Sequence, residues 1–121
     1  MYKRQSSIRR EPMKELRGGV GVTIVDHILE KTEIKTNCRM FTKMTLEPGA
    51  SIGYHKHERE EDTYYILSGI ATVRDNSEKT FKVYPGEVVC ALDGESHSIA
   101  NDGDIPLEFI SIILTYDPPQ R

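Results

Sequence analysis

Turn-forming residues interrupt this chain at short, regular intervals, and that spacing constrains its fold most. Between the turns lie apolar or alternating runs that are rich in Val, Ile, Thr, Tyr and Phe, the residues that suit the half-buried surface of a sheet. Short strands at this spacing favour an all-β sandwich or barrel over alternating strands and helices. The eight runs cover residues 20–29, 38–46, 51–57, 63–67, 70–74, 80–84, 88–92 and 107–116.

The length of 121 residues, or 13.8 kDa, fits one domain, which we expect at 20–117. We predict a flexible N-terminal arm at 1–19, with a brief helical turn near 12–16 and a hinge at 17–19, and a C-terminal tail at 118–121. Read back from a GTG start codon, residues 1–5 resemble the end of a transposon adapter used in shotgun libraries. Two interpretations of 1–5 stay open: a cloning artefact on a metagenomic fragment, or an ordinary basic N-terminus.

Charge and cysteine content narrow the classes of partner. The formal net charge is -3, and the basic residues near the N-terminus lack any nucleic-acid motif, so we expect a solvated tail and no nucleic acid. Cys38 and Cys90 form no C-x-x-C pair, which favours two reduced thiols. No apolar run is long enough to span a membrane. We expect a cytoplasmic protein by default, with secretion open if the true start is missing.

Three histidines and a carboxylate have the spacing of a metal site. His55 and His57 are two residues apart, so in a strand both side chains point to one face. A charged loop follows and brings Glu61 or Asp62 to the start of the next strand, while His97 begins another strand. Three imidazoles and one carboxylate, without thiolate, suit one Mn, Fe, Ni, Cu or Zn ion and leave coordination positions open.

The spacing around these residues resembles the first motif of the cupin superfamily. That motif is Gly, five residues, His-x-His, three or four residues, Glu, six residues and Gly. Here Gly49 is followed by five residues, His55-Lys56-His57, four residues, Asp62, six residues and Gly69. Asp62 thus stands in the Glu position.

The second cupin motif is Gly, five residues, Pro-x-Gly, two residues, His, three residues and Asn. This chain has Gly86, Leu92-Asp93-Gly94, His97 and Asn101 at those intervals, with Leu92 in the Pro position. The resemblance implies a jelly roll, or double-stranded β-helix barrel, with the ion inside its mouth. The residues in and around the two motifs are most similar to those of small single-domain bacterial cupins of the type-2 kind. This resemblance implies a homodimer that pairs N-terminal strands.

Two carboxylates compete for the fourth ligand position. Counted back from Gly69, Asp62 occupies it, whereas Glu61 satisfies a three-residue count from His57. We favour Asp62, because Gly69 sets the strand register and a one-residue slip would turn the side chain to the other face. Glu61 remains the alternative, reaching in through a bulge.

Tyr64 and Arg39 are the candidate catalytic residues. Tyr64 shares strand parity with Asp62 and can line the cavity or pack as a core aromatic. Arg39 could bind a substrate carboxylate if its face looked into the barrel, but strict alternation favours an outward, solvated face. We interpret Cys90 as a structural thiol and His27 as a surface histidine. The acidic loop 58–61 is either solvated, which we favour, or shapes the entrance of the pocket.

Together these features predict a mononuclear metalloprotein, which we expect to be an enzyme acting on a small carboxylate or carbohydrate. Lewis-acid chemistry of the isomerase, lyase or decarboxylase type is our first hypothesis. Oxidative chemistry with Cu or Fe, including polysaccharide cleavage, is the second. A non-catalytic module that binds a small molecule is the third. No dedicated general base is apparent in the sequence.

Overall fold

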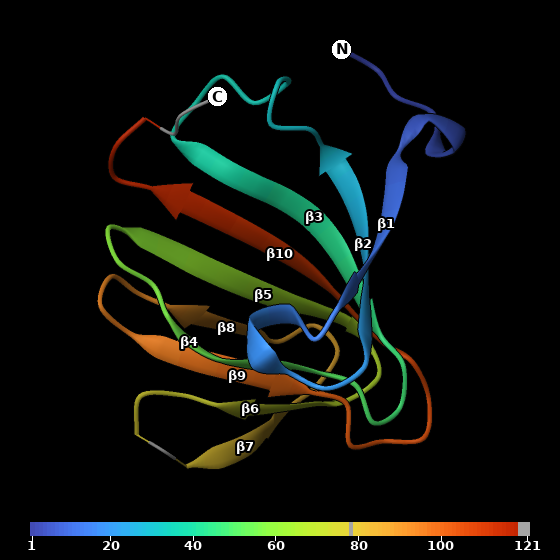
Figure 1. Cartoon of the computed structure of the whole chain (residues 1–121), viewed down its shortest axis with the longest axis vertical. Coiled ribbons are helices and arrows are strands. Elements are labelled where there is room, and N and C mark those ends of the chain that lie inside the picture. Colours follow the sequence, from blue (N-terminus) through green and yellow to red (C-terminus); the bar gives the residue numbers. More distant parts are fainter. Residues whose placement is uncertain (78, 119–121) are drawn as a thin grey trace.

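Two antiparallel sheets build the protein, whose computed structural model describes residues 1–77 and 79–118 (Figure 1). The larger sheet has the order β1-β2-β3-β10-β5-β8, and the smaller has the order β4-β9-β6-β7. The described elements are η1 (Gln5–Ser7), β1 (Arg9–Lys14), η2 (Leu16–Gly18), β2 (Val22–Leu29), β3 (Cys38–Leu46), β4 (Ser51–Lys56), β5 (Glu60–Ser68), β6 (Ala71–Arg74), β7 (Thr80–Val83), β8 (Val88–Ala91), β9 (Ser96–Ala100) and β10 (Leu107–Thr115).

The hydrophobic core lies between the two sheets. Leu46, Ile66 and Phe109 come from the larger sheet, and Val73 and Ile99 from the smaller one, all of them fully buried. Outward positions on the same strands are polar or partly exposed, as the period of two along a strand requires. The all-β prediction is confirmed, and eight of the strands fall on or close to the predicted runs and β9 starts next to His97.

Gly69 illustrates why turn residues mark the ends of strands in this sequence. It follows β5 with a φ of 81°, a left-handed conformation that glycine adopts without steric cost. A Cβ atom at this position would lie 2.6 Å from the carbonyl oxygen of Pro106. The turn between β5 and β6 therefore requires glycine, and the pairing of β5 with β10 shifts by one residue just before it, between Ile66 and Ser68.

The N-terminal segment differs from the expected flexible arm. Residues 9–14 form β1, which pairs antiparallel with β2 from Arg9 opposite His27 to Lys14 opposite Val22. Pro12 lies within this strand, so the helical turn predicted near 12–16 is wrong. A proline is tolerated there because β1 is an edge strand. The short helical turn η2 comes later, at Leu16–Gly18.

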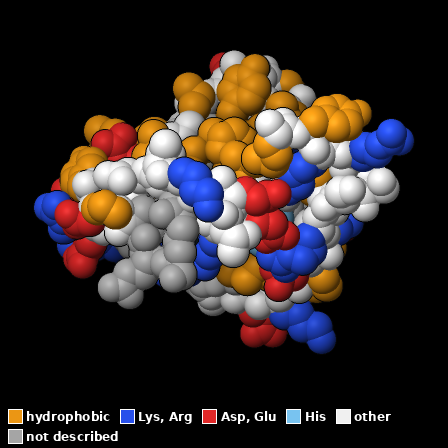
Figure 2. Space-filling view, turned by 90° about the horizontal axis from the view of Figure 1, so that it is seen from above, with side chains coloured by type: hydrophobic (Ala, Val, Ile, Leu, Met, Phe, Trp, Pro, Cys, Tyr) orange, Lys and Arg blue, Asp and Glu red, His pale blue; other side chains and the backbone are white. Residues whose placement is uncertain are grey.

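The two ends of the chain and its surface were also the subject of predictions. Within residues 1–5, Lys3 donates a hydrogen bond to the carbonyl of Ile28 and pairs with Glu33 at 2.8 Å. Most of the predicted tail, 119–121, lies outside the described residues. Among the described residues, no helix has the length and apolar character needed to cross a membrane. On the face in Figure 2, acidic and basic side chains lie next to each other.

Candidate metal centre

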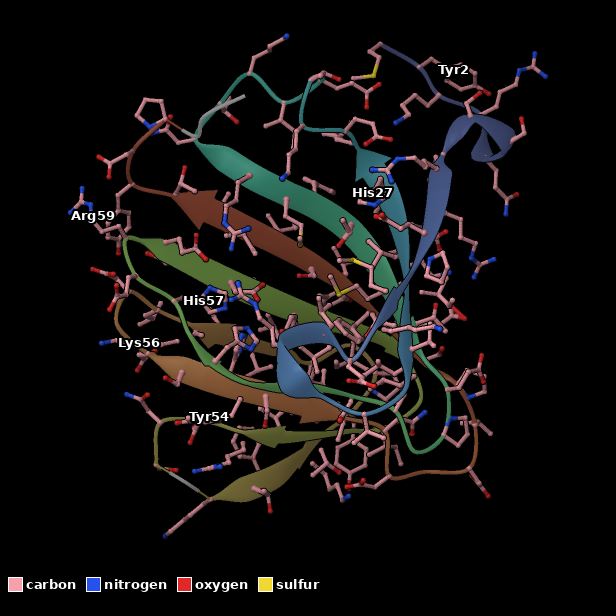
Figure 3. All side chains as sticks on the ribbon, viewed as in Figure 1. Tyr2, His27, Tyr54, Lys56, His57 and Arg59 are labelled. Carbon is pink, nitrogen blue, oxygen red and sulfur yellow. The ribbon has the colours of Figure 1, made fainter. Side chains whose placement is uncertain are left out.

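Three strands bring four polar side chains together inside the barrel. His55 lies on β4 directly opposite His97 on β9, and His57 follows the end of β4. Asp62 lies on β5 of the other sheet. One ligand atom from each residue lies within 4.8 Å of all the others. Figure 3 shows His57 between β4 and β5, while His27 lies apart on β2.

The distances suit one shared ion. His57 Nε2 and His97 Nε2 are 3.1 Å apart, and each lies 3.2 Å from Asp62 Oδ2. Two donor atoms about 2.1 Å from one metal ion stand ~3.0–3.4 Å apart at bond angles of about 90–110°. His57, Asp62 and His97 are at most 3% exposed, and His55 is partly buried. The residues present therefore fit a mononuclear transition-metal site.

Hydrogen bonds on the far side of two imidazoles orient them. His55 Nδ1 donates to the carbonyl oxygen of Gly53 at 2.6 Å, and His57 Nδ1 donates to Glu60 Oε2 at 2.5 Å. In both rings this arrangement leaves Nε2 as the lone-pair donor toward the centre. His97 is held differently, by its ring, which stacks on Tyr64 with centroids 4.6 Å apart and planes 4° from parallel.

Burial and neighbouring charges set opposite pKa shifts in this cluster. Burial lowers the pKa of His55 to about 4, so its imidazole is neutral at pH 7. Burial also opposes a charge on His57, but hydrogen bonds to Asp62 and Glu60 outweigh it and raise the pKa of His57. The pKa of Asp62 is lowered, because hydrogen bonds from His57 and His97 outweigh its burial.

The structure groups Asp62, and not Glu61, with the histidines. Asp62 accepts a further hydrogen bond from Ser111 Oγ at 3.2 Å. Glu61 points to the opposite face of β5, where its Oε2 accepts a hydrogen bond from the Tyr116 hydroxyl at 3.0 Å. A bulge that would turn Glu61 inward is not seen, since β5 pairs without a shift from Glu60 to Tyr65.

Comparison with known proteins decides the family. A sequence profile of the cupin domain matches residues 42–113, more than half of the chain. This chain is a cupin. It is 41% identical to an oxalate-binding protein of Thermotoga maritima over 94% of this chain and 93% of that protein. It is 28% identical to an oxalate decarboxylase of Bacillus subtilis over 87% of this chain, which spans only 27% of that protein.

Solved structures agree on the fold. A crystal structure described as a predicted oxalate decarboxylase of Thermotoga maritima shares 41% identity, covers 95% of this cupin and 99% of that chain, and superposes with a TM-score of 0.88. The polyketide cyclase RemF of Streptomyces resistomycificus superposes with a TM-score of 0.77 at 19% identity, over 99% of this cupin and 83% of that chain. The second similarity concerns the fold alone. The predicted cupin jelly roll is confirmed.

Arg39 and Glu60 belong to the surroundings of the site, against expectation. Met40 pairs with Ile113 and Cys38 with Leu114, so Arg39 is an extra residue in β3. Such a bulge re-aims a side chain, and Arg39 lines the metal cavity where strict alternation predicted an outward, solvated face. It binds Glu60 with two hydrogen bonds of 2.6 and 2.8 Å. Glu60, whose side chain is 13% exposed, is therefore not solvated as expected but joins Arg39 to His57.

The cavity in front of the metal site measures about 50 Å³. Tyr64 lines it and is fully buried, and burial together with the Asp62 carboxylate raises the pKa of its phenol. Arg17 and Leu16, on η2, also line the cavity. From the sequence we expected Arg17 in a hinge and not at the cavity. The two glycines that follow it, Gly18 and Gly19, were the one sign of a tight turn at this point.

Two other expectations concern residues outside this cavity. His27 is not a bare surface histidine, because its Nε2 lies 2.9 Å from Glu11 Oε1 and its side chain is only 16% exposed. Cys90 accepts a hydrogen bond from Thr63 Oγ1 at 3.3 Å and forms no disulfide. Cys90 therefore has a packing contact and stays a structural thiol in our interpretation.

Proposed function

We propose that this cupin binds one divalent transition-metal ion per chain and holds a small carboxylate, such as oxalate, at that ion. The ligands would be His55, His57, Asp62 and His97. The observation that carries the proposal is the convergence of three imidazoles and one carboxylate on a single buried point. The similarity to an oxalate-binding protein over almost the whole chain supports the choice of ligand.

The donor set limits the metal and its chemistry. Three nitrogen donors and one oxygen donor, without thiolate, suit Mn, Fe, Ni, Cu or Zn. A bound ion of this kind supplies a Lewis acid that polarises a carboxylate oxygen. The protein contributes fixed imidazoles, because Gly53 and Glu60 hold two of them from behind. Tyr64 contributes a flat wall that keeps His97 from rotating.

The shape of the cavity favours a small ligand. About 50 Å³ has room for a few water-sized groups. A carbohydrate polymer needs an open groove in which several rings can lie, but His57 and His97 are buried beneath the mouth. Oxidative polysaccharide cleavage, our second hypothesis at the sequence level, therefore receives no support from the geometry.

Decarboxylation is the second candidate function, favoured by the similarity to an oxalate decarboxylase. In that reaction the C–C bond of oxalate breaks, one carbon leaves as CO2, and the other takes up a proton to become formate. The acidic side chains beside the cavity are engaged, Glu60 by Arg39 and His57, and Asp62 by the histidines. Binding without turnover is for this reason our first proposal.

Metal analysis and calorimetry test the proposal. We expect one equivalent of metal in protein purified without added metal, and oxalate binding that disappears when the metal is removed. Replacing His55 and His57 together by Ala should abolish both and leave a folded β protein. His27→Ala is the matched control, because His27 lies outside the site. Full metal retention in the double variant would refute the assignment of His55 and His57 as metal ligands.

Turnover is measured in the same preparation. Incubation of the metal-loaded protein with oxalate, followed by assays for formate and CO2, separates the two candidates. Unchanged oxalate supports a binding protein. Formation of formate and CO2 in equal amounts, lost in the double variant, establishes the decarboxylase instead.

A further inference from the structure

The turn η2 places one cation at the mouth of the metal cavity. We infer that Arg17 is the specificity-determining residue of this cupin and that it receives the second carboxylate group of a metal-bound dicarboxylate. This inference rests on the proposed function and names the chemical class of ligand within it. It begins from the position of Arg17, which lines the cavity together with His55 and Tyr64.

The backbone of the turn is seated firmly on β4. A Cβ atom on Gly19 would lie 2.1 Å from the carbonyl oxygen of Ser51, and one on Gly53 would lie 2.1 Å from that of Arg17. Val20 N donates to Ser51 Oγ, and Ser51 N donates to Val20 O, both at 2.9 Å. Figure 1 shows η2 crossing in front of β4. The position of residue 17 is thus fixed by main-chain packing.

Arg17 itself adopts an unusual conformation. Its φ of 55° lies in the left-handed region, which residues other than glycine rarely adopt. Such conformations persist where the surroundings determine them, and they gather at functional sites. Leu16 packs on the core and anchors the turn from below. Leu16 therefore holds the turn, and Arg17, an exposed residue, lines the mouth of the cavity.

The other arginine of the cavity is already occupied. The guanidinium of Arg39 donates two hydrogen bonds to the carboxylate of Glu60. Arg17, by contrast, makes no hydrogen bond or ion pair with any residue in 1–77 or 79–118. Its charge nevertheless acts on His55 and Tyr64. A guanidinium without a protein partner beside a metal site is suited to a carboxylate of the ligand, which it can bind with two parallel hydrogen bonds.

Charge balance points to a dianion. Glu60 and Arg39 neutralise each other, and Asp62 offsets one charge of a divalent ion. One positive charge remains at the metal, and Arg17 adds a second. A dicarboxylate neutralises both, whereas a monocarboxylate leaves the exposed Arg17 with solvent alone as its partner. The cavity therefore favours a short dicarboxylate over acetate or formate.

Calorimetry with two ligands tests this role. In metal-loaded protein we expect Arg17→Gln to weaken oxalate binding by about 10–100-fold, since a hydrogen bond between charged groups is lost. Acetate affinity should change by less than about threefold, and metal affinity should not fall. Lys14→Gln, an exposed cation on β1 of the same segment, is the matched control and should bind oxalate like the wild type.

Two further variants separate recognition from folding. Arg17→Gly relieves the left-handed conformation, so it should melt no lower than the wild type and still lose oxalate affinity. Arg17→Lys keeps the charge but not the fork and should recover only part of the affinity. Equal losses for oxalate and acetate, or an oxalate affinity within twofold of the wild type in Arg17→Gln, would overturn the inference. A wild type that binds metal but no carboxylate would overturn the proposed function itself.

Discussion

Glu60 offers the sharpest test of how the protein tunes its metal site. The substitution Glu60→Gln keeps the size of the side chain but removes its charge. In the structure this carboxylate accepts the Nδ1 proton of His57 at 2.5 Å and binds Arg39. Loss of the charge makes the His57 imidazole a weaker electron-pair donor to the metal ion. It also leaves the Arg39 guanidinium near that ion without its counter-ion.

The expected magnitude follows from the position of Glu60 behind a metal ligand. Removal of a carboxylate that orients a ligating histidine typically weakens metal binding by about 10–100-fold, or about 1.4–2.7 kcal/mol. The side chain of Glu60 is only 13% exposed, so solvent screens this interaction weakly. We expect the upper half of that range, since repulsion from Arg39 adds to the loss.

Competition titrations with a chelator of known affinity measure this effect. The matched control is Glu61→Gln, the same change at the next residue of the strand, whose side chain faces Tyr116 instead of the site. It should bind metal within about twofold of the wild type, and Asp62→Asn should lose at least as much affinity as Glu60→Gln. A larger loss in Glu61→Gln would show that the register of β5 is wrong. An unchanged affinity in Glu60→Gln would refute the role of the carboxylate behind His57.

The remaining predictions concern pH, the turn and assembly. Because the pKa of His57 is raised above 6.5, metal must displace its proton, and metal affinity should fall about tenfold per pH unit below that raised value, measured by titration from pH 8 to 6. Protonated His57 conversely stabilises the metal-free fold below pH 6.5, and this contribution is lost as pH rises through the raised pKa; acid unfolding of metal-free protein checks the sign. Gly53→Ala should displace η2 and reduce oxalate affinity, whereas Gly103→Ala, with 3.4 Å of clearance, should not. Light scattering should show a homodimer. The run 20–29, which we expected to pair with a neighbour's sheet, has its edge covered by β1, so the exposed edge is that of β1, beside the hollow of about 540 Å³ on β1–β3. Deletion of 1–20 should weaken the dimer, and a clean monomer of the intact chain contradicts this prediction.

Much of the barrel could be predicted, because turns and strand parity are local properties. The run at 38–46 coincides with β3. Asp62, Tyr64 and Ile66 alternate along β5, and all three are buried on one face. The motif count from Gly69 favoured Asp62, which is the carboxylate grouped with the histidines, although the one-residue shift of β5 near Leu67 could not be seen in the sequence.

Features that depend on distant contacts could not be predicted. Strand β1 has the sequence Arg9-Arg10-Glu11-Pro12-Met13-Lys14, which lacks apolar alternation and forms a strand only because the edge of β2 is available. The bulge at Arg39 arises from the pairing of β3 with β10 and leaves no mark in the sequence. Glu60 shares the inward parity of Asp62 and Tyr64 on β5, but its contacts with Arg39 and His57 depend on side chains that are distant in the sequence.

The site has two parts of different origin, and their variants should behave differently. Strands β4, β5 and β9 supply the metal ligands, whereas the segment before β2 supplies the turn that closes the mouth. A defect in the first part removes the ion and with it every ligand that the ion holds. A defect at Arg17 leaves the ion in place and alters only which anion is preferred. Metal affinity and oxalate affinity should therefore fall together in variants of Glu60, but separately in variants of Arg17, because the four candidate metal ligands all lie outside η2.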